Sequence, residues 1–139
     1  MGFNEDLIED YRANGKASKG PFVGRQILLL TTTGAKTGTA RTSPLVYTKD
    51  GDDLVIVASK GGAPTNPDWF HNLKAHPTVT VELGGDKFAA RAKVAAPDTE
   101  RERLYAAHAR VHPVFLDYVQ KTTRRIPVVR LERIGPSAA

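Results

Sequence analysis

The sequence predicts a mainly β (α+β) fold, an antiparallel barrel with helices at its periphery. Residues 78–83 and 87–95 alternate between apolar and polar side chains and are separated by a Gly-Gly turn, which is typical of a hairpin with one buried face. Strand-like and helix-like segments follow one another without the regular alternation that a doubly wound parallel sheet requires. The two patterns together favour an antiparallel barrel over a parallel sheet.

The amino-terminal part predicts a helix, a connector and a buried strand. Residues 4–14 place apolar side chains on one helical face, with Asn4 as the cap and Gly15 as the terminator. A polar connector follows as far as Gly24. The apolar run within residues 25–33 is too short for a helix of its own and predicts a buried strand.

The rest of the chain predicts a further hairpin, three helices and a last strand. Residues 42–48 and 53–58 are joined by an Asp-Gly turn, which indicates an antiparallel pair. A helix capped by Asn66 begins at Pro67-Asp68 and stops at His76-Pro77. A second helix, opened by Pro97-Asp98, covers residues 99–111 with Leu104, His108 and Val111 on one side. A short helix from His112-Pro113 through Val119 and a strand over 126–134 follow.

Length and composition predict a single domain over residues 1–139. A chain of 139 residues is of a common size for one core, and no internal repeat or linker divides it. Residues 1–24 form the first helix and the connector, and residues 135–139 form a frayed tail. No apolar run approaches the roughly 20 residues that span a bilayer, and the amino terminus is acidic, so we expect a cytoplasmic protein.

Residue usage excludes several kinds of chemistry. The sequence contains no Cys, which excludes a thiolate nucleophile, an iron–sulfur cluster and a cysteine zinc site. His108 and His112 are four positions apart on a predicted helix but lack a third ligand, so we expect no metal. Neither a G-x-S-x-G elbow nor a G-x-G-x-x-G turn opening a helix occurs. Any redox chemistry must therefore come from a bound cofactor.

Residues 30–41 form a candidate anion site. They contain Gly34 and Gly38, several hydroxyl side chains, and the cations Lys36 and Arg41. Backbone amides and cations in such a turn can hold a phosphate, and the net charge of +5 favours anionic partners. The segment is not a P-loop, because Ala35 stands where that pattern needs Gly. An ordinary exposed loop is the alternative interpretation.

Residues 57–64 form a second glycine-containing cluster, which follows one predicted strand and precedes a predicted helix. Small residues there would let a flat ring approach the backbone, and a flexible strand-to-helix loop is the alternative. Trp69 lies at helical spacing from Leu73 and is either a stacking group or a core residue. Two such loops from adjacent strands would favour one shared site.

Four blocks of the sequence, taken in order, point to a known family. They are residues 28–38 (LLLTTTGAKTG), 41–45 (RTSPL), 57–62 (VASKGG) and 67–77 (PDWFHNLKAHP). Together they resemble the deazaflavin-dependent nitroreductase family of actinobacteria over about residues 25 to 131. Four blocks in the correct order are more specific than any one of them.

The resemblance implies a split β-barrel that holds coenzyme F420 (8-hydroxy-5-deazaflavin). It also implies hydride transfer from the reduced coenzyme to a hydrophobic acceptor, a quinone such as menaquinone. The implied cofactor-binding residues are Ala35, Lys36, Thr37 and Arg41 for the phosphate and acidic tail, Thr42, Ser43, Pro44, Leu45, Val46, Tyr47, Val57, Ala58, Ser59 and Lys60 for the ring, and Asp68, Trp69, Asn72 and Phe115 around the pocket, of which Trp69 and Asn72 would close it.

The catalytic candidates lie on the acceptor side. The hydroxyls of Ser59 and Tyr118 could donate a hydrogen bond to the acceptor oxygen, while a loop cap and a core-edge tyrosine are the structural alternatives. Relatives active on nitroimidazoles carry a tyrosine triplet where this chain has His112, Phe115 and Tyr118. His112 could replace a tyrosine as proton donor. We expect quinone reduction with weak or no nitroimidazole turnover.

Two alternatives to this function stay open at the level of sequence. One is a flavin mononucleotide reductase or oxidase on the same barrel. The other is a basic β-barrel for single-stranded nucleic acid, which would need exposed aromatic residues along a basic groove; we expect no nucleic-acid partner. The sequence is compatible with a monomer or a homodimer, and with peripheral contact at the inner face of the plasma membrane.

Overall fold

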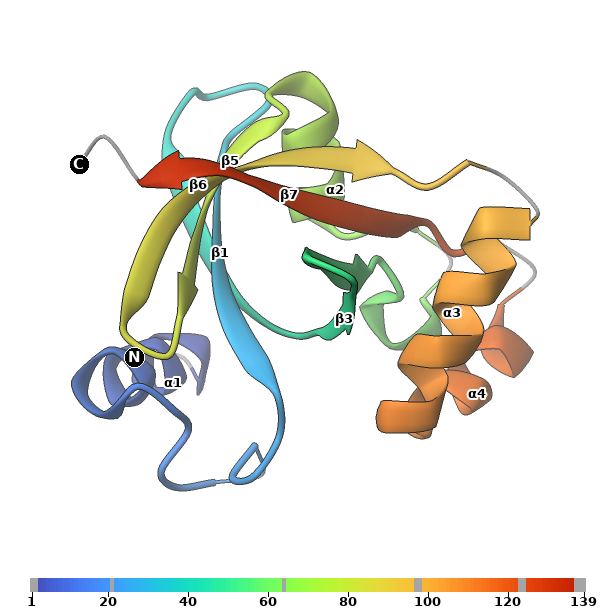
Figure 1. The fold of residues 1–139 in the computed structure, drawn as a ribbon, viewed down its shortest axis with the longest axis horizontal. Coiled ribbons are helices and arrows are strands. Elements are labelled where there is room, and N and C mark those ends of the chain that lie inside the picture. The colour runs from blue at the N-terminus through green and yellow to red at the C-terminus, as the bar shows by residue number, and fades with distance from the viewer. Residues whose placement is uncertain (1–2, 21, 64, 97–98, 123–124, 137–139) are drawn as a thin grey trace.

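Seven strands form one antiparallel sheet in the part of the chain that the computed structural model describes, residues 3–20, 22–63, 65–96, 99–122 and 125–136. The strand order is β2-β1-β5-β6-β7-β4-β3, with β2 and β3 at the two edges. The sheet curls into a barrel that is split between these edges, and helices lie around it (Figure 1). The predicted antiparallel barrel with peripheral helices is confirmed.

The elements have the following bounds. The strands are β1 (Ile27–Thr33), β2 (Ala40–Val46), β3 (Thr48–Asp50), β4 (Asp53–Val57), β5 (Thr78–Leu83), β6 (Asp86–Val94) and β7 (Val128–Pro136). The helices are α1 (Phe3–Asn14), α2 (Asp68–Ala75), α3 (Thr99–Val111) and α4 (Val114–Lys121), with a short 3-10 helix, η1 (Lys60–Gly62), after β4.

The predictions for the first part of the chain are largely confirmed. Gly15 ends α1 with φ +73°, and its N–H donates to the Tyr11 carbonyl at 2.7 Å, so a glycine suits this position. The cap prediction for Asn4 is wrong, because the helix already includes Phe3. The β5–β6 hairpin is present, and it turns at Gly84 and Gly85, both with positive φ.

The prediction of one hairpin from residues 42–48 and 53–58 is wrong in its pairing. Residues 40–46 pair instead with all seven residues of β1, and only Thr48–Asp50 pair with the start of β4. The chain changes partner at Tyr47, which lies between β2 and β3. The apolar pattern identified the strand but not its partner, and the longer register with β1 satisfies more backbone groups.

Several boundaries also differ from the prediction. The cap position of α2 is Pro67, with extended backbone, rather than Asn66. Val111, the last residue of α3, is 49% exposed, so it does not join Leu104 and His108 on the buried side. β7 continues through Pro136, so residues 135 and 136 are not a tail. The predicted helix opening at Pro97-Asp98 and residues 137–139 lie outside the described residues.

Three apolar clusters fix the relative positions of the elements. The barrel interior contains Leu28, Leu30 and Ile56, all fully buried, together with α2. A second cluster joins α3 and α4 to the outer face of β4 and β7, and a third joins α1 to β1. Truncating a fully buried leucine to alanine costs about 2–5 kcal/mol, so the leucines of the barrel interior contribute strongly to the stability of this fold.

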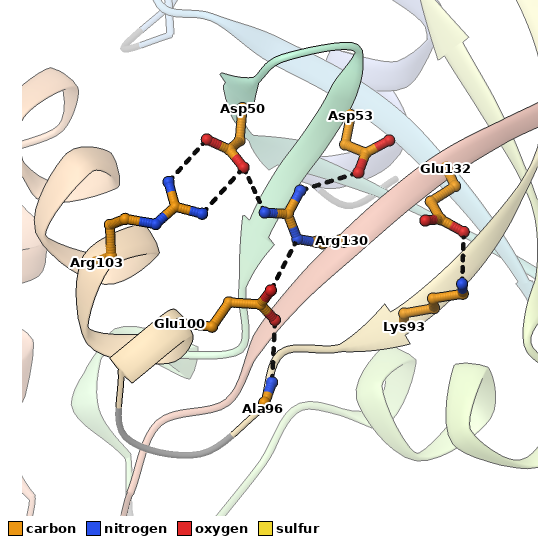
Figure 2. A network of polar contacts seen from close by, with 8 residues as sticks. All are labelled: Asp50, Asp53, Lys93, Ala96, Glu100, Arg103, Arg130 and Glu132. Atoms are coloured by element: carbon orange, nitrogen blue, oxygen red, sulfur yellow. Dashed lines mark hydrogen bonds and ion pairs between the residues drawn. The ribbon is translucent and has the colours of Figure 1, made fainter.

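An ion-pair network holds α3 against the β3–β4 hairpin and β7 (Figure 2). Arg130 of β7 donates to Asp53 at 2.9 Å and to Asp50, and its Nε lies 3.6 Å from Glu100 of α3. Arg103 of α3 donates to both carboxylate oxygens of Asp50, at 2.9 and 3.3 Å. The hydrogen bonds from Arg103 and then Arg130 lower the pKa of Asp50 to about 2.

Candidate active site

The turn that joins β1 to β2, residues 34–39, has a defined set of backbone contacts. The Gly34 N–H donates to the Thr39 carbonyl at 2.7 Å, and the Gly38 N–H donates to the Gly34 carbonyl at 2.9 Å. The Ala35 N–H donates to Oδ1 of Asn72 at 2.9 Å. Within the described residues, the amides of Lys36 and Thr37 have no such partner, so two neighbouring donors remain for a ligand.

The cations of this segment are exposed and unpaired. Neither Lys36 nor Arg41 forms an ion pair with any residue that the structure describes. The Thr37 and Thr39 hydroxyls lie 2.8 Å apart beside them. Free cations, free amides and hydroxyls on one turn are the donor set that a phosphate or carboxylate requires.

Little room remains for a side chain at Gly34 in this turn. A Cβ at position 34 would lie 2.5 Å from Oγ1 of Thr37, which is closer than real Cβ atoms approach. Neither Gly34 nor Thr39 was predicted from the sequence to have a specific role in the site. The spacing of glycines and hydroxyls was the available signal, whereas the clash with Thr37 depends on the folded turn.

Trp69 and Asn72 of α2 are both buried. Trp69 is 8% exposed and belongs to the barrel-interior cluster. Asn72 is 9% exposed, and its Nδ2 donates to Oγ1 of Thr32 at 3.2 Å while its Oδ1 accepts from Ala35. That these two side chains close the coenzyme pocket stays a prediction. Asp68, in the first turn of the same helix, is exposed.

The predicted ring-lining residues of β2 do not share one face. Strand side chains alternate, and the register places Arg41, Ser43 and Leu45 opposite residues of β1 that face the barrel interior. Thr42, Pro44 and Val46 point to the other face; Thr42 Oγ1, for example, lies 2.8 Å from Thr31 Oγ1. A ligand on one face can therefore meet the side chains of only alternate residues in this predicted set.

Tyr47, the last residue of that set, lies at the crossover between β2 and β3 and is half-buried. Its ring packs against the barrel-interior cluster, and burial raises the pKa of its phenol. The hydroxyl of Tyr47 therefore stays protonated around neutral pH.

The loop after β4 begins with buried residues. The side chains of Val57 and Ala58 are buried in the core, so only their backbone can line a ligand site. Ser59 is 6% exposed and stands at the start of η1. Lys60 has φ +48°, which is unusual for a residue other than glycine, and its exposed side chain reaches Oγ1 of Thr65 at 3.4 Å. Such backbone strain is concentrated at functional sites.

The two glycine-containing loops follow strands that are not adjacent. β5, β6 and β7 separate β1 from β4 in the sheet, which corrects the expectation of neighbouring strands. Because each successive pair is antiparallel, β1 and β4 run in the same direction, and their carboxyl-terminal ends lie at the same end of the barrel. The two loops therefore leave the barrel at the same end, although the strands that precede them are not neighbours.

Helix α4 packs on η1 and brings Tyr118 to that loop. A Cβ at Gly62 would lie 3.1 Å from the Tyr118 carbonyl oxygen, so the two backbones are in close contact. Tyr118 is half-buried, with its ring edge-on to Phe115 at a centroid distance of 5.0 Å. Phe115 is buried between α3, α4 and the sheet, so it does not form an exposed aromatic wall.

His112 is committed to structural contacts. It is 1% exposed; its Nε2 donates to the Tyr47 carbonyl at 2.9 Å, and its Nδ1 accepts from Arg25 at 3.1 Å. Burial lowers the pKa of His112, and Arg25 lowers it further, against the effect of the hydrogen bond to Tyr47. The one N–H of the neutral ring is engaged by the Tyr47 carbonyl, so this hydrogen bond would have to break before His112 could donate a proton to an acceptor.

His108 is also buried and neutral. Its Nδ1 lies 3.0 Å from Oγ1 of Thr48, and burial lowers its pKa to about 3. Across the described ranges of the chain, no group of three or more His, Asp or Glu side chains is placed to hold a metal ion. None of the helices in those ranges is long and apolar enough to cross a membrane.

The fold is a split β-barrel, and the turn at residues 34–39 presents donors that suit an anionic coenzyme. A family model described as F420H(2)-dependent quinone reductase matches residues 6–133, and the chain belongs to this family. The family assignment makes the protein an oxidoreductase that depends on coenzyme F420. Of the two coenzymes that the sequence left open, the comparisons support F420 rather than flavin mononucleotide.

Individual relatives agree with this assignment. The quinone reductase of the same description from Mycobacterium tuberculosis is 46% identical over 108 residues, which cover 76% of this chain and 72% of the relative. The solved structure of an F420-H2 dependent reductase is 39% identical with a TM-score of 0.71, covering 78% of this chain and 95% of the other. A structure described as a domain-swapped dimer has the same identity and TM-score, and covers 78% and 81%.

The residues of the turn fit this coenzyme. Coenzyme F420 carries a phosphate and a glutamate tail, and the unpaired Lys36 and Arg41 with the free amides of Lys36 and Thr37 provide matching donors. The N–H of Ala35 is not available to the coenzyme, because it already donates to Asn72.

Proposed function

We propose that this protein reduces a lipid-soluble quinone, menaquinone in particular, with reduced coenzyme F420. The observation that carries the coenzyme half of the proposal is the segment of residues 34–41, with the unpaired cations Lys36 and Arg41 and the free amides of Lys36 and Thr37. When bound, the reduced coenzyme supplies a hydride, which together with one proton from solvent converts a quinone to a hydroquinone. The deazaflavin ring has a carbon where a flavin has a nitrogen, and this carbon disfavours one-electron chemistry. The main task of the chain is therefore to orient the coenzyme and the quinone.

The tail side of the site orients the coenzyme. Lys36 and Arg41 bind the phosphate and carboxylates of the coenzyme, and the backbone amides of Lys36 and Thr37 fix the position of the phosphate. Ser43 and Leu45, which share the face of Arg41 on β2, are the side chains of that strand nearest to this path. A coenzyme held at several points along one strand presents its ring in one orientation.

The acceptor side is formed by the loop after β4 and by α4. Ser59 starts η1, and Tyr118 lies on the helix that packs on η1, so both hydroxyls belong to one corner of the molecule. A hydroxyl there stabilises the negative charge that develops on the acceptor oxygen. The same helix exposes Leu116 and Val119, at 55% and 43%, which suits a hydrophobic acceptor.

Nitroimidazoles are poor substrates in this proposal. Of the three positions that carry tyrosines in relatives active on these compounds, two are occupied here by the buried His112 and Phe115. Only Tyr118 retains a phenol that a substrate can approach. Losing two donors changes the choice of acceptor more than it changes hydride transfer itself.

We further propose a homodimer that works at the inner face of the plasma membrane, where its quinone resides. The support for a dimer is the related structure described as domain-swapped, and the support for membrane contact is the apolar face of α4. Light scattering and sedimentation with anionic vesicles test these two statements separately. A monomer that stays in the supernatant contradicts both.

The test of the proposed function is a turnover assay with the purified protein and reduced coenzyme F420. The absorbance of the coenzyme on reoxidation is followed with a short-chain menaquinone analogue and, in parallel, with a nitroimidazole. We expect catalysed reoxidation with the quinone and a rate at least about tenfold lower with the nitroimidazole. Equal rates would contradict the acceptor preference, and no binding of the coenzyme would contradict the proposed function as a whole.

A further inference from the structure

Asn72 links α2 to the turn that carries the unpaired cations. Its carboxamide makes two hydrogen bonds to residues far away in the sequence: Oδ1 accepts from the Ala35 N–H at 2.9 Å, and Nδ2 donates to Oγ1 of Thr32 at 3.2 Å. The side chain is 9% exposed, so water cannot replace these contacts without cost. One amide group thus fixes the last residues of β1 and the first part of the turn.

This contact decides which amides of the turn remain available. The N–H groups of Gly34, Gly38 and Thr39 are used within the turn itself. Ala35 is exposed, and without Asn72 its N–H would have no internal acceptor, so the Gly34–Ala35 peptide group would be held only by the hydrogen bond from the Gly38 N–H to the Gly34 carbonyl and would rotate more easily. Because Ala35 directly precedes Lys36, a rotation there would move the Lys36 amide out of its present orientation.

We propose that Asn72 is a positioning residue for the coenzyme tail. It does not touch the coenzyme; it holds residues 34–39 in the one conformation that presents the Lys36 and Thr37 amides and the Lys36 cation as a preformed anion site. The inference rests on the proposed function, because the anion is the phosphate and glutamate tail of coenzyme F420. Preformation matters because a turn that must be ordered by its ligand binds that ligand more weakly.

The consequence is measured by comparing two ligands. One is coenzyme F420, and the other is its deazaflavin fragment with the same ring and ribityl chain but without the phosphate and glutamate tail. We define the tail preference as the Kd of the fragment divided by the Kd of the coenzyme, both from fluorescence titration. A residue that acts through the tail site alters this ratio, whereas general damage to the barrel weakens both ligands.

The main variant is Asn72→Leu, which keeps a similar volume and removes both hydrogen bonds. We expect its tail preference to fall about tenfold, with the fragment Kd unchanged within about twofold. Thr32→Val removes only the contact to Nδ2 and leaves the Ala35 contact in place, so we expect a smaller fall of about threefold. His71→Gln, an exposed neighbour on the same helix, is the matched control and leaves the ratio unchanged.

A second readout needs no coenzyme. Amide hydrogen exchange in the free protein reports whether the Ala35 N–H is protected, and we expect it to exchange faster in Asn72→Leu but not in His71→Gln. A tail preference that stays at the wild-type value in Asn72→Leu, or equal weakening of both ligands, would overturn the positioning role. If Asn72→Leu does not fold, the same ratio in Thr32→Val decides, and an unchanged ratio there would overturn it.

Binding by the wild-type protein separates a failure of the proposed function from a failure of the role of Asn72. Wild-type protein that binds neither the coenzyme nor the fragment would sink the proposed function, and the role of Asn72 with it. Wild-type protein with a clear tail preference that Asn72→Leu retains would sink the role of Asn72 alone.

Discussion

The cations of two regions behave in opposite ways. Around Arg130, every guanidinium faces carboxylates: Arg130 contacts Asp50, Asp53 and Glu100, and Arg103 contacts Asp50 (Figure 2). On the segment from Gly34 to Arg41, neither cation has a carboxylate partner among the residues described. Both regions lie beside a turn between two strands.

This difference separates structural charge from functional charge. A half-buried arginine that is surrounded by acids connects elements of the fold and cannot also recruit a ligand. Exposed cations without partners contribute little to stability, and they retain their attraction for an anion. The net charge of +5 is therefore informative only when the paired cations are set aside.

The largest expected effect is on the unpaired side of the comparison. In a Lys36→Gln/Arg41→Gln double variant we expect the Kd of coenzyme F420 to rise about 100-fold, since two charge-assisted contacts are lost. The affinity for the tail-less fragment should change little, and the melting temperature should stay the same. Fluorescence titration and thermal unfolding measure these quantities.

A charge-matched control makes this first prediction specific. Lys49→Gln/Lys87→Gln removes two exposed cations from β3 and β6, away from the turn. It should leave the coenzyme Kd within about threefold of wild type, because distant surface charges are screened at physiological salt. A loss equal to that of the first double variant would show that net charge, and not this turn, governs binding.

The next effect lies on the paired side. Replacing Arg130 by Met leaves Asp50, Asp53 and Glu100 close together without their shared cation. We expect the free energy of unfolding to fall by about 2 kcal/mol, and the coenzyme Kd to stay the same. Urea denaturation measures the first and titration the second. A variant as stable as wild type would contradict the structural role given to this network.

A third group of basic side chains, the buried imidazoles, sharpens the comparison through pH. Burial lowers the folded-state pKa of His108 to about 3, below the ordinary value of about 6.5 that it has in the unfolded chain, so the unfolded chain binds more protons below pH 6.5. Stability is therefore lost as pH falls from about 6.5 towards 3. Between pH 7 and pH 5 we expect a loss of about 1.5 kcal/mol that His108→Leu removes.

Urea denaturation at several pH values measures this third effect. The wild type and His108→Leu should diverge most at pH 5 and least near pH 7.5, where the imidazole is neutral in both the folded and the unfolded state. Parallel profiles for the two proteins would mean that His108 is not the group that titrates.

The smallest effect is the salt dependence of binding. Raising NaCl from about 50 mM to about 500 mM shortens the Debye length from roughly 14 Å to roughly 4 Å, and we expect the coenzyme Kd to rise several-fold. The fragment without the tail should bind almost independently of salt. Equal salt dependence for both ligands would be inconsistent with a tail site on residues 34–41.

The strands and helices were predictable where the pattern is local. The hairpin of β5 and β6 follows from alternation and from the Gly84-Gly85 turn. The sequence did not predict that residues 40–50 divide between two partner strands, β1 and β4, because strand pairing depends on segments distant in the chain. A periodic pattern identifies an element and its buried face, but it does not identify the neighbour.

The candidate site shows the same limit at the level of side chains. Lys36 and Arg41 were identifiable because the sequence places two cations beside two glycines after a predicted strand, whereas their lack of a carboxylate partner became visible only in the described part of the structure. Asn72, Phe115 and His112 were predicted to lie at the ligand site. The structure adds contacts that the sequence did not indicate, to Ala35 for Asn72, within the core for Phe115 and to Tyr47 for His112. Matching motifs locate a region, but only the fold shows which way each side chain points.

The most direct test of the account is the tail preference of the wild-type protein at low salt. If residues 34–41 hold the phosphate and glutamate tail, coenzyme F420 binds at least about tenfold more tightly than its tail-less deazaflavin fragment, which corresponds to about 1.4 kcal/mol. Equal affinity for the two ligands would contradict it, because the unpaired cations would then contribute nothing to coenzyme binding.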